Sequence, residues 1–296
     1  MSHAVSTAIR RATIPGPVRP TRPPSTRFPA GACDCHSHVF GSQEQYPYAA
    51  QAAYIAEYLP AEAYIDMLTT IGFTRAVLVQ PSVYGTDNRC MVDTMRSGEF
   101  EFRGVVVVDP DISDAELKAL HAAGARGVRI NAASSTPGLR MEHAPKLARR
   151  LGPLGWHLQF FINLTQTPNI VHDIARLPIP CVIDHFGHVH AEEGVQGPGF
   201  QTLLELARFD HVWFKLGGGY RVSKLPPPFE DVAPLAQALM AQAEDRCVFG
   251  TDWPHPNVKR MDDDGDLADA LTLWVPDERQ RHKVLVENPA RLYQFD

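Results

Sequence analysis

Two histidines separated by one residue, His36 and His38, stand near the start of the chain. In an extended segment residues i and i+2 point to the same face, so the two imidazoles project side by side if this segment is a β-strand. Two imidazoles aimed at one point can bind a metal ion or form a polar, proton-accepting wall of a pocket. A hydrogen-bonded pair of core histidines is the alternative interpretation, and the rest of the chain has to decide.

Other side chains capable of chemistry follow apolar runs further along the chain. His185 follows Asp184 at the end of one run, and Asp252 stands in the sequence Gly-Thr-Asp-Trp-Pro-His at the end of the last run. Six of the thirteen histidines lie at or just beyond the end of such a run: His36, His38, His185, His188, His190 and His255. Random scatter would not concentrate titratable groups in this way, so we expect a shared pocket.

Eight apolar runs rich in β-branched residues recur after residue 32. Continuous rather than alternating hydrophobicity is typical of strands buried on both faces, as in parallel sheets. The runs are Asp34–Phe40, Ala76–Gln80, Gly104–Asp109, Gly127–Asn131, Leu158–Asn163, Cys181–His185, Val212–Leu216 and Cys247–Thr251. Helical patterns separate the runs, at Pro60–Ile71, after a capping-box pattern at Ser113–Glu116, and at His143–Leu154, Phe200–Phe209, Val232–Ala243 and Asp277–Val286.

Strands that alternate with helices over this length predict an α/β fold, a (β/α)8 TIM-type barrel, in a single domain over residues 32–296. A doubly wound sheet is the second choice, because no run is followed by the Gly-rich phosphate turn usual in dinucleotide-binding folds. Active sites of such barrels lie at the carboxyl ends of the strands. The barrel therefore predicts that the candidate side chains face one cavity.

The composition limits the partners. The 296 residues are 44% hydrophobic and 21% charged, with a formal net charge of −6. The negative charge argues against nucleic acid and against an anionic membrane as the main partner, and no apolar run approaches the roughly 20 residues of a membrane span. The five cysteines form no CxxC pair and are expected to be reduced, packed thiols in a cytoplasmic protein.

Residues 1–31 differ from the rest of the chain. They contain five arginines, six prolines and no acidic residue. Prolines at this density forbid a long amphipathic helix and predict an extended arm, either loose or laid across the barrel or a neighbouring subunit. An organelle-targeting peptide is the alternative.

The motifs resemble those of the amidohydrolase superfamily: His-x-His ends the first run, Asp-His the sixth, and Gly-Thr-Asp-Trp-Pro the eighth. With Gln80-Pro81-Ser82 and Gly85-Thr86-Asp87-Asn88, they are most similar to the amidohydrolase 2 type. Within that type they resemble the lactonase branch, typified by 2-pyrone-4,6-dicarboxylate lactonase and D-galactarolactone isomerase. The similarity extends from about Ala32 to the final helix, and it implies a barrel enzyme that acts on a lactone.

The resemblance implies roles for four residues. Hydrolysis of a lactone needs a nucleophilic water, a polarised carbonyl and a proton for the leaving oxygen. Asp252 matches the general base, which deprotonates water and later returns the proton, although it could be a structural carboxylate bonded to the imidazoles. His185 is expected to donate to the carbonyl oxygen, with a core histidine as the alternative. His36 and His38 would hold Asp252 and the water, or bind a metal with it.

We expect no obligatory metal and no other cofactor. Metal-dependent relatives add a lysine on the fourth strand or a histidine on the fifth, and the runs Gly127–Asn131 and Leu158–Asn163 contain neither. A divalent metal, zinc, remains the alternative. It would be held by His36, His38 and Asp252, because three protein ligands and a water suffice for zinc.

The substrate-binding residues are expected near the same strand ends. Arginine is the bidentate partner of carboxylates, and Arg221, which follows three glycines, is expected to be free to reach a ligand. The full predicted set is Ser82, Tyr84, Arg129, Arg221, His255 and Tyr48, the last from the long loop Ser42–Leu59.

We therefore predict a hydrolase that opens a small-molecule lactone. Residues 132–135 read Ala-Ala-Ser-Ser where the dicarboxylate lactonase pattern has arginine, so a lactone with a single carboxylate is expected. A lactone isomerase and a catalytically silent binding protein are the alternatives. The run Asp262-Asp263-Asp264 predicts a solvated surface.

Overall fold

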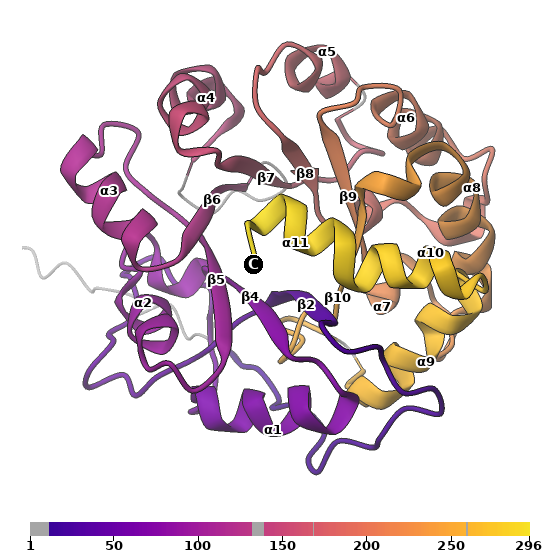
Figure 1. Cartoon of the computed structure of the whole chain (residues 1–296), viewed down its shortest axis with the longest axis horizontal. Coiled ribbons are helices and arrows are strands. Elements are labelled where there is room, and N and C mark those ends of the chain that lie inside the picture. The colour runs from indigo at the N-terminus through magenta and orange to yellow at the C-terminus, as the bar shows by residue number, and fades with distance from the viewer. Residues whose placement is uncertain (1–11, 132–138, 168, 259) are drawn as a thin grey trace, which may run out of the picture.

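Eight parallel strands follow one another around a barrel in chain order, with the helices outside them (Figure 1). The computed structural model describes residues 12–131, 139–167, 169–258 and 260–296, so the predictions for residues 1–11 and 132–135 lie outside the described part. The strands are β2 (Cys33–Ser37), β4 (Arg75–Val79), β5 (Glu101–Val106), β6 (Ala125–Asn131), β7 (His157–Phe161), β8 (Cys181–Ile183), β9 (Val212–Gly217) and β10 (Cys247–Gly250). Each overlaps one predicted run, and the predicted (β/α)8 barrel is confirmed.

Helices connect the strands and cover the outside of the barrel. They are α1 (Ala61–Ile71), α2 (Arg89–Arg96), α3 (Asp114–Ala122), α4 (Ala144–Leu151), α5 (Ile170–Ala175), α6 (Pro198–Leu206), α7 (Gly219–Val222), α8 (Ala233–Ala243), α9 (Asp264–Trp274), α10 (Glu278–His282) and α11 (Asn288–Tyr293). The predicted capping box starts α3, because the Ser113 hydroxyl accepts from the Glu116 N–H and the Glu116 carboxylate from the Ser113 N–H. Among the described helices, none has the length and apolar character needed to cross a bilayer.

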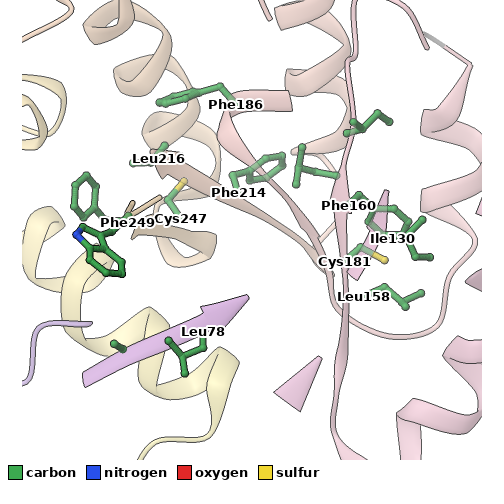
Figure 2. Packing of buried hydrophobic residues seen from close by; sticks show 14 of the residues in the cluster. Leu78, Ile130, Leu158, Phe160, Cys181, Phe186, Phe214, Leu216, Cys247 and Phe249 are labelled. Carbon is green, nitrogen blue, oxygen red and sulfur yellow. The ribbon is translucent and has the colours of Figure 1, made fainter. Parts of the chain in front are cut away.

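Apolar side chains pack on both faces of the sheet. Leu78, Leu158 and Phe214 belong to the large cluster that includes the buried residues of the surrounding helices (Figure 2). Alternate strand residues such as Val77 form a smaller cluster with Tyr293 and its neighbours. Helix α11 lies across the end of the barrel in Figure 1 and supplies those neighbours. Burial on both faces explains the continuous hydrophobic runs.

The first strand and the segment after the last strand are joined by two backbone hydrogen bonds, which we call the seam. The Asp252 N–H donates to the His36 carbonyl at 2.8 Å, and the His38 N–H donates to the Trp253 carbonyl at 2.7 Å. The seam brings the His-x-His segment and Asp252 together at the carboxyl end of the barrel.

The buried carboxylate of Asp34 stabilises the seam through hydrogen bonds to the last strand segment and to helix α1. Asp34 accepts hydrogen bonds from the Thr251 N–H at 2.9 Å, from the Thr251 hydroxyl at 2.7 Å and from the Tyr64 hydroxyl of α1 at 2.8 Å. One side chain therefore links the first strand, the last strand and a helix.

The described part of the N-terminal arm lies along the barrel, one of the three arrangements left open by the sequence. Residues Ala12–Thr13 (β1) pair in parallel with Tyr54–Ile55 (β3) of the long loop after the first barrel strand. Arg22 forms ion pairs of 2.7 and 2.6 Å with Asp266 and Asp269 of α9. The strand pairing and the ion pairs thus hold the arm against the loop after the first barrel strand and against α9.

The expectation of a solvated surface at residues 262–264 is wrong. The Asp263 carboxylate accepts from the Gly265 N–H at 2.8 Å and caps α9, and it also accepts from the Arg22 N–H. Asp264 is fully buried, 3.2 Å from His255. The run is the start of a helix, where carboxylates satisfy free N–H groups and favour the helix dipole.

Replacing Asp34 by Ala is expected to lower the free energy of unfolding by about 3 kcal/mol, because buried donors left without acceptors cost about 1–3 kcal/mol each. Urea unfolding followed by circular dichroism measures the loss. Tyr64→Phe is the matched control, since it removes one of the four bonds that Asp34 accepts, the fourth being from the His36 N–H, and should cost about 1 kcal/mol. Equal losses in the two variants would contradict a central role for the Asp34 carboxylate.

Candidate active site

The four predicted catalytic candidates meet at the carboxyl ends of their strands. Asp252 Oδ1 lies 3.4 Å from His38 Nε2 and 3.6 Å from His36 Nε2, and Oδ2 lies 3.8 Å from His185 Nε2. All four side chains are buried. The structure therefore gathers three imidazoles around one carboxylate, as the strand-end argument predicts.

Two of these residues have a left-handed backbone conformation, which residues other than glycine rarely adopt. Asp252 has a φ of 66° and His185 a φ of 47°. Such conformations cost about 1–3 kcal/mol each and persist only when the surroundings fix them. At Asp252 the seam bond to His36 and a 2.7 Å bond from the His255 N–H to the Asp252 carbonyl supply that support. In this conformation both side chains line the cavity at the barrel mouth.

Asp252 has two further partners from the segment after β9. The Arg221 guanidinium of α7 donates to Oδ2 from Nε at 2.6 Å and lies 2.5 Å away through Nη2, and the Tyr220 hydroxyl donates to the same oxygen at 2.6 Å. Burial alone would raise the pKa of Asp252, but Arg221 and the nearby imidazoles hold it well below the usual value. Arg221 is therefore bound to Asp252, and the expectation that it is free is wrong.

His38 presents a lone pair to Asp252. Its Nδ1 lies 2.7 Å from the Val79 carbonyl oxygen, which can only accept, so the ring proton is on Nδ1. Burial lowers the pKa of His38, which keeps the ring neutral. His38 Nε2 and Asp252 Oδ1 are consequently two acceptors 3.4 Å apart. The pair is arranged to accept both protons of one water molecule, or to bind a cation.

A second carboxylate lies deeper in the barrel beside His36. Asp184 Oδ1 is 3.3 Å from His36 Nδ1 and 3.4 Å from Lys215 Nζ, and Oδ2 accepts from the Gln159 amide at 3.1 Å. Burial favours the neutral acid, but Lys215 and His36 outweigh it and hold the pKa of Asp184 well below its usual value. Burial and then Lys215 lower the pKa of His36 to about 3. The deep site contains an ion pair and a neutral imidazole.

A cavity of about 130 Å³ opens above Asp252. Three predicted substrate-binding residues line it: Ser82, Arg129 and Arg221. Lining residues outside the predicted set include Tyr54, Asn131, Phe161 and Asn257. A wider outer cavity of about 510 Å³ adjoins it through Phe161, Arg221 and Asn257.

The other three predicted substrate-binding residues do not line this cavity. The Tyr48 hydroxyl donates to the Ala56 carbonyl at 3.3 Å, and its ring packs against Tyr84, whose hydroxyl accepts from the Gly41 N–H. Both residues follow strands in the sequence, which predicts that they lie near the barrel mouth but does not predict the direction of their side chains.

His255 lies behind Asp252 instead of facing the cavity. It is buried between the Tyr220 hydroxyl, 3.1 Å from Nδ1, and the Asp264 carboxylate, 3.2 Å from Nε2. Burial lowers the pKa of His255, but Asp264 outweighs it and raises the pKa overall. His255 therefore supports Tyr220, which in turn donates to Asp252.

The sequence contains a signal for some of the residues that the predicted set lacks. Lys215 and Gln159 are polar residues inside apolar strand runs, and a polar side chain buried in a barrel requires a partner. Asn131 ends a predicted run. Asn257 lies beyond the last strand and has no such signal.

The donor atoms would fit a metal ion. The ligand atoms of His36, His38 and Asp252 lie within 4.8 Å of one another, and His36, Asp184 and His185 form a second such group. The Val79 carbonyl on His38 Nδ1 is the kind of outer contact that orients metal-binding histidines. Two cations stand against this, because Arg221 occupies Oδ2 of Asp252 and Lys215 Nζ lies 3.2 Å from His36 Nδ1.

Comparison with known proteins gives a consistent result. A family model described as Amidohydrolase matches residues 33–295. The chain is 38% identical over 287 residues to 4-sulfomuconolactone hydrolase of Hydrogenophaga intermedia, with 94% of this chain and 93% of that protein covered. It is 37% identical over 289 residues to 2-pyrone-4,6-dicarboxylate hydrolase of Comamonas testosteroni, with 91% and 92% covered.

A solved structure supports the same relationship. The apo structure of an Agrobacterium tumefaciens protein superimposes with a TM-score of 0.83 at 26% identity, over 92% of this chain and 99% of that one.

Replacing Arg221 by Met is expected to raise the pKa of Asp252 and to destabilise the fold by about 3–5 kcal/mol at neutral pH, because a buried carboxylate loses its cation. With Arg221 present, the lowered pKa of Asp252 stabilises the folded state above the usual pKa of about 4. The deficit should therefore grow as the pH rises above that value. Urea unfolding between pH 4 and pH 8, with Tyr220→Phe as a control that keeps the cation, tests this. A deficit independent of pH would contradict it.

Proposed function

The chain belongs to the amidohydrolase family, and on that premise we propose that it hydrolyses the ring ester of a carboxylated lactone. Two relatives that are 37–38% identical over nearly their full lengths are hydrolases of a muconolactone and of a pyrone. The observation that supports the proposal most directly is the pair of acceptors, His38 Nε2 and Asp252 Oδ1, at the floor of a small cavity.

Water activation is the first step of the proposed reaction. A water in the cavity donates one hydrogen bond to His38 Nε2 and a second one to Asp252 Oδ1, which leaves a lone pair of its oxygen for attack on the lactone carbonyl. Asp252 accepts the second proton as the new C–O bond forms. Because Arg221 and the imidazoles keep the pKa of Asp252 low, the carboxylate is ionised before the water attacks.

Polarisation of the carbonyl and protonation of the leaving oxygen complete the reaction. Burial holds the pKa of His185 well below its usual value, so the neutral ring can donate one N–H to the carbonyl oxygen as charge develops there. The tetrahedral intermediate collapses with cleavage of the ring C–O bond. Asp252 then returns its proton to the leaving ring oxygen, and the products are a carboxylic acid and a hydroxyl or its keto form.

The substrate carboxylate is proposed to bind Arg129 and Ser82. Both line the cavity, and the Arg129 guanidinium stacks over the Phe161 ring with its carbon 5.1 Å from the ring centre. Its Nη1 donates to the Gln80 carbonyl at 3.3 Å and its Nη2 lies 3.7 Å from Asp184, so the guanidinium is held in place at the cavity wall, where its charge can attract a carboxylate. Only one such arginine is free of Asp252 among the described lining residues, which favours one carboxylate near the reacting bond.

We propose that the reaction does not require a metal. A divalent ion at His36, His38 and Asp252 would supply a polarised water and a Lewis acid. In the present site Arg221 and Lys215 already place positive charge beside the two buried carboxylates. Each step above uses only side chains of the chain itself.

A panel of carboxylated muconolactones, pyrones and sugar lactones tests the proposed function. Acid release on at least one ring, measured with a pH indicator, is expected for the purified enzyme. Asp252→Asn should lower kcat by about 100- to 10,000-fold, the range typical of a lost general base.

Asp93→Asn is the control for the same substitution at a surface carboxylate that bonds Tyr46 and lies away from the cavity. It should keep normal activity. A ring that moves without acid release would identify an isomerase, and saturable binding without turnover a binding protein; either result would reject hydrolysis. An Asp252→Asn variant with near-normal kcat would remove Asp252 as the base.

Removal of metal is expected to leave the activity intact. The protein is treated with a strong chelator, exchanged into metal-free buffer and examined by elemental analysis, and kcat is compared before and after. Activity without a stoichiometric divalent metal supports the proposal. Loss of activity that zinc restores would assign His36, His38 and Asp252 as metal ligands instead.

A further inference from the structure

Lys215 is a charged residue completely buried inside the barrel, and the proposed reaction gives it no step. It stands on β9, and its ammonium donates to the side-chain amide oxygen Oε1 of Gln159 at 2.8 Å. It also lies 3.4 Å from Asp184 Oδ1 and 3.2 Å from His36 Nδ1. A buried ammonium needs such partners to offset desolvation. Its contact with a ring nitrogen of His36 has a further consequence.

Two groups of opposite kind compete for His36 Nδ1. An ionised carboxylate can only accept and an ammonium can only donate, so a neutral imidazole can satisfy Asp184 or Lys215 through this atom, but not both. Asp184 requires a proton on Nδ1, whereas Lys215 requires a lone pair there. The proton of His36 must then be on Nδ1 in the first case and on Nε2 in the second.

The contacts favour Lys215 as the partner. Its ammonium meets hydrogen-bond geometry with His36 Nδ1 at 3.2 Å. Asp184 Oδ1, at 3.3 Å from the same nitrogen, has no hydrogen-bond partner among the described residues. The other oxygen of Asp184 accepts from Gln159, so the carboxylate is oriented without His36.

We infer that Lys215 fixes the proton of His36 on Nε2. The two histidines of the His-x-His motif then present different groups to Asp252, one a hydrogen-bond donor and the other an acceptor. His38, bound to the Val79 carbonyl, presents a lone pair. His36 presents an N–H, 3.6 Å from Asp252 Oδ1. Lys215 is thus a positioning residue that acts through His36.

Opposite tautomers have a chemical purpose. The His36 N–H faces Asp252 Oδ1 from 3.6 Å, beyond hydrogen-bond distance, while the lone pair of His38 receives a water proton; this role rests on the proposed function, but the tautomers themselves do not. A divalent metal would need lone pairs on both Nε2 atoms. By holding His36 in the donor form, Lys215 also works against metal binding.

The tautomers can be observed directly in the unmodified protein. Heteronuclear NMR of protein labelled at the histidine rings distinguishes protonated from unprotonated ring nitrogens, and the signals of each ring are assigned by their loss in His36→Gln and His38→Gln. We expect the proton on Nε2 in His36 and on Nδ1 in His38. A proton on Nδ1 of both rings would overturn the inference, whether or not any variant folds.

Zinc affinity of the metal-free protein, measured by competition with a chromogenic chelator, provides the second test. Lys215→Met leaves Asp184 as the partner of His36 and should raise the affinity by about 10- to 100-fold, the size typical of outer contacts to metal ligands. Asp184→Asn removes the competitor and should lower it. Damage to the barrel would lower the affinity in both variants.

A control separates the tautomer from simple loss of charge. Arg129→Met removes a cation 3.7 Å from Asp184 that does not contact His36 Nδ1, so it should change zinc affinity little. Equal increases in Arg129→Met and Lys215→Met would reject the inference in favour of electrostatics alone. Neither measurement uses a lactone, so failure of the lactone panel and failure of this inference are distinguishable.

Discussion

The site depends on the seam between the first strand and the segment after the last strand. Two backbone hydrogen bonds, from Asp252 to His36 and from His38 to Trp253, close the barrel at the point where its chemistry lies. They hold Asp252 in a left-handed conformation that the chain would otherwise avoid. The same hydrogen bonds therefore close the barrel and position Asp252. Asp34 stabilises them by accepting a hydrogen bond from the Thr251 N–H next to the seam.

Two cations lie beside the carboxylates at the centre of the site. Among the buried carboxylates, Asp252 faces Arg221 and Asp184 faces Lys215. Burial lowers the pKa of the surrounding imidazoles, of which His36 and His185 are examples. Neutral rings remain available as donors and acceptors. Removing either cation would leave a buried carboxylate without its charged partner, which is strongly destabilising.

The sequence predicts the parts of the site that depend on strand ends. Continuous apolar runs locate all eight strands, and parallel order then places Asp252, His185 and the His-x-His pair at one edge. Side-chain direction beyond the strands follows from backbone conformation in loops, which the residue pattern does not specify. For this reason Arg221 pairs with Asp252 at the cavity wall, His255 lies behind Asp252, and Tyr48 packs away from the cavity.

The acceptor pair also bears on the type of reaction. A water has two protons and satisfies both His38 Nε2 and Asp252 Oδ1, which lie 3.4 Å apart. In an isomerisation the nucleophile is a hydroxyl of the substrate, which has only one proton to donate. Either His38 Nε2 or Asp252 Oδ1 then receives no hydrogen bond from the nucleophile. Two unsatisfied acceptors at this distance repel each other and lose the hydrogen bonds they would have had. The fixed tautomer of His38 therefore suits the water nucleophile of the proposed reaction.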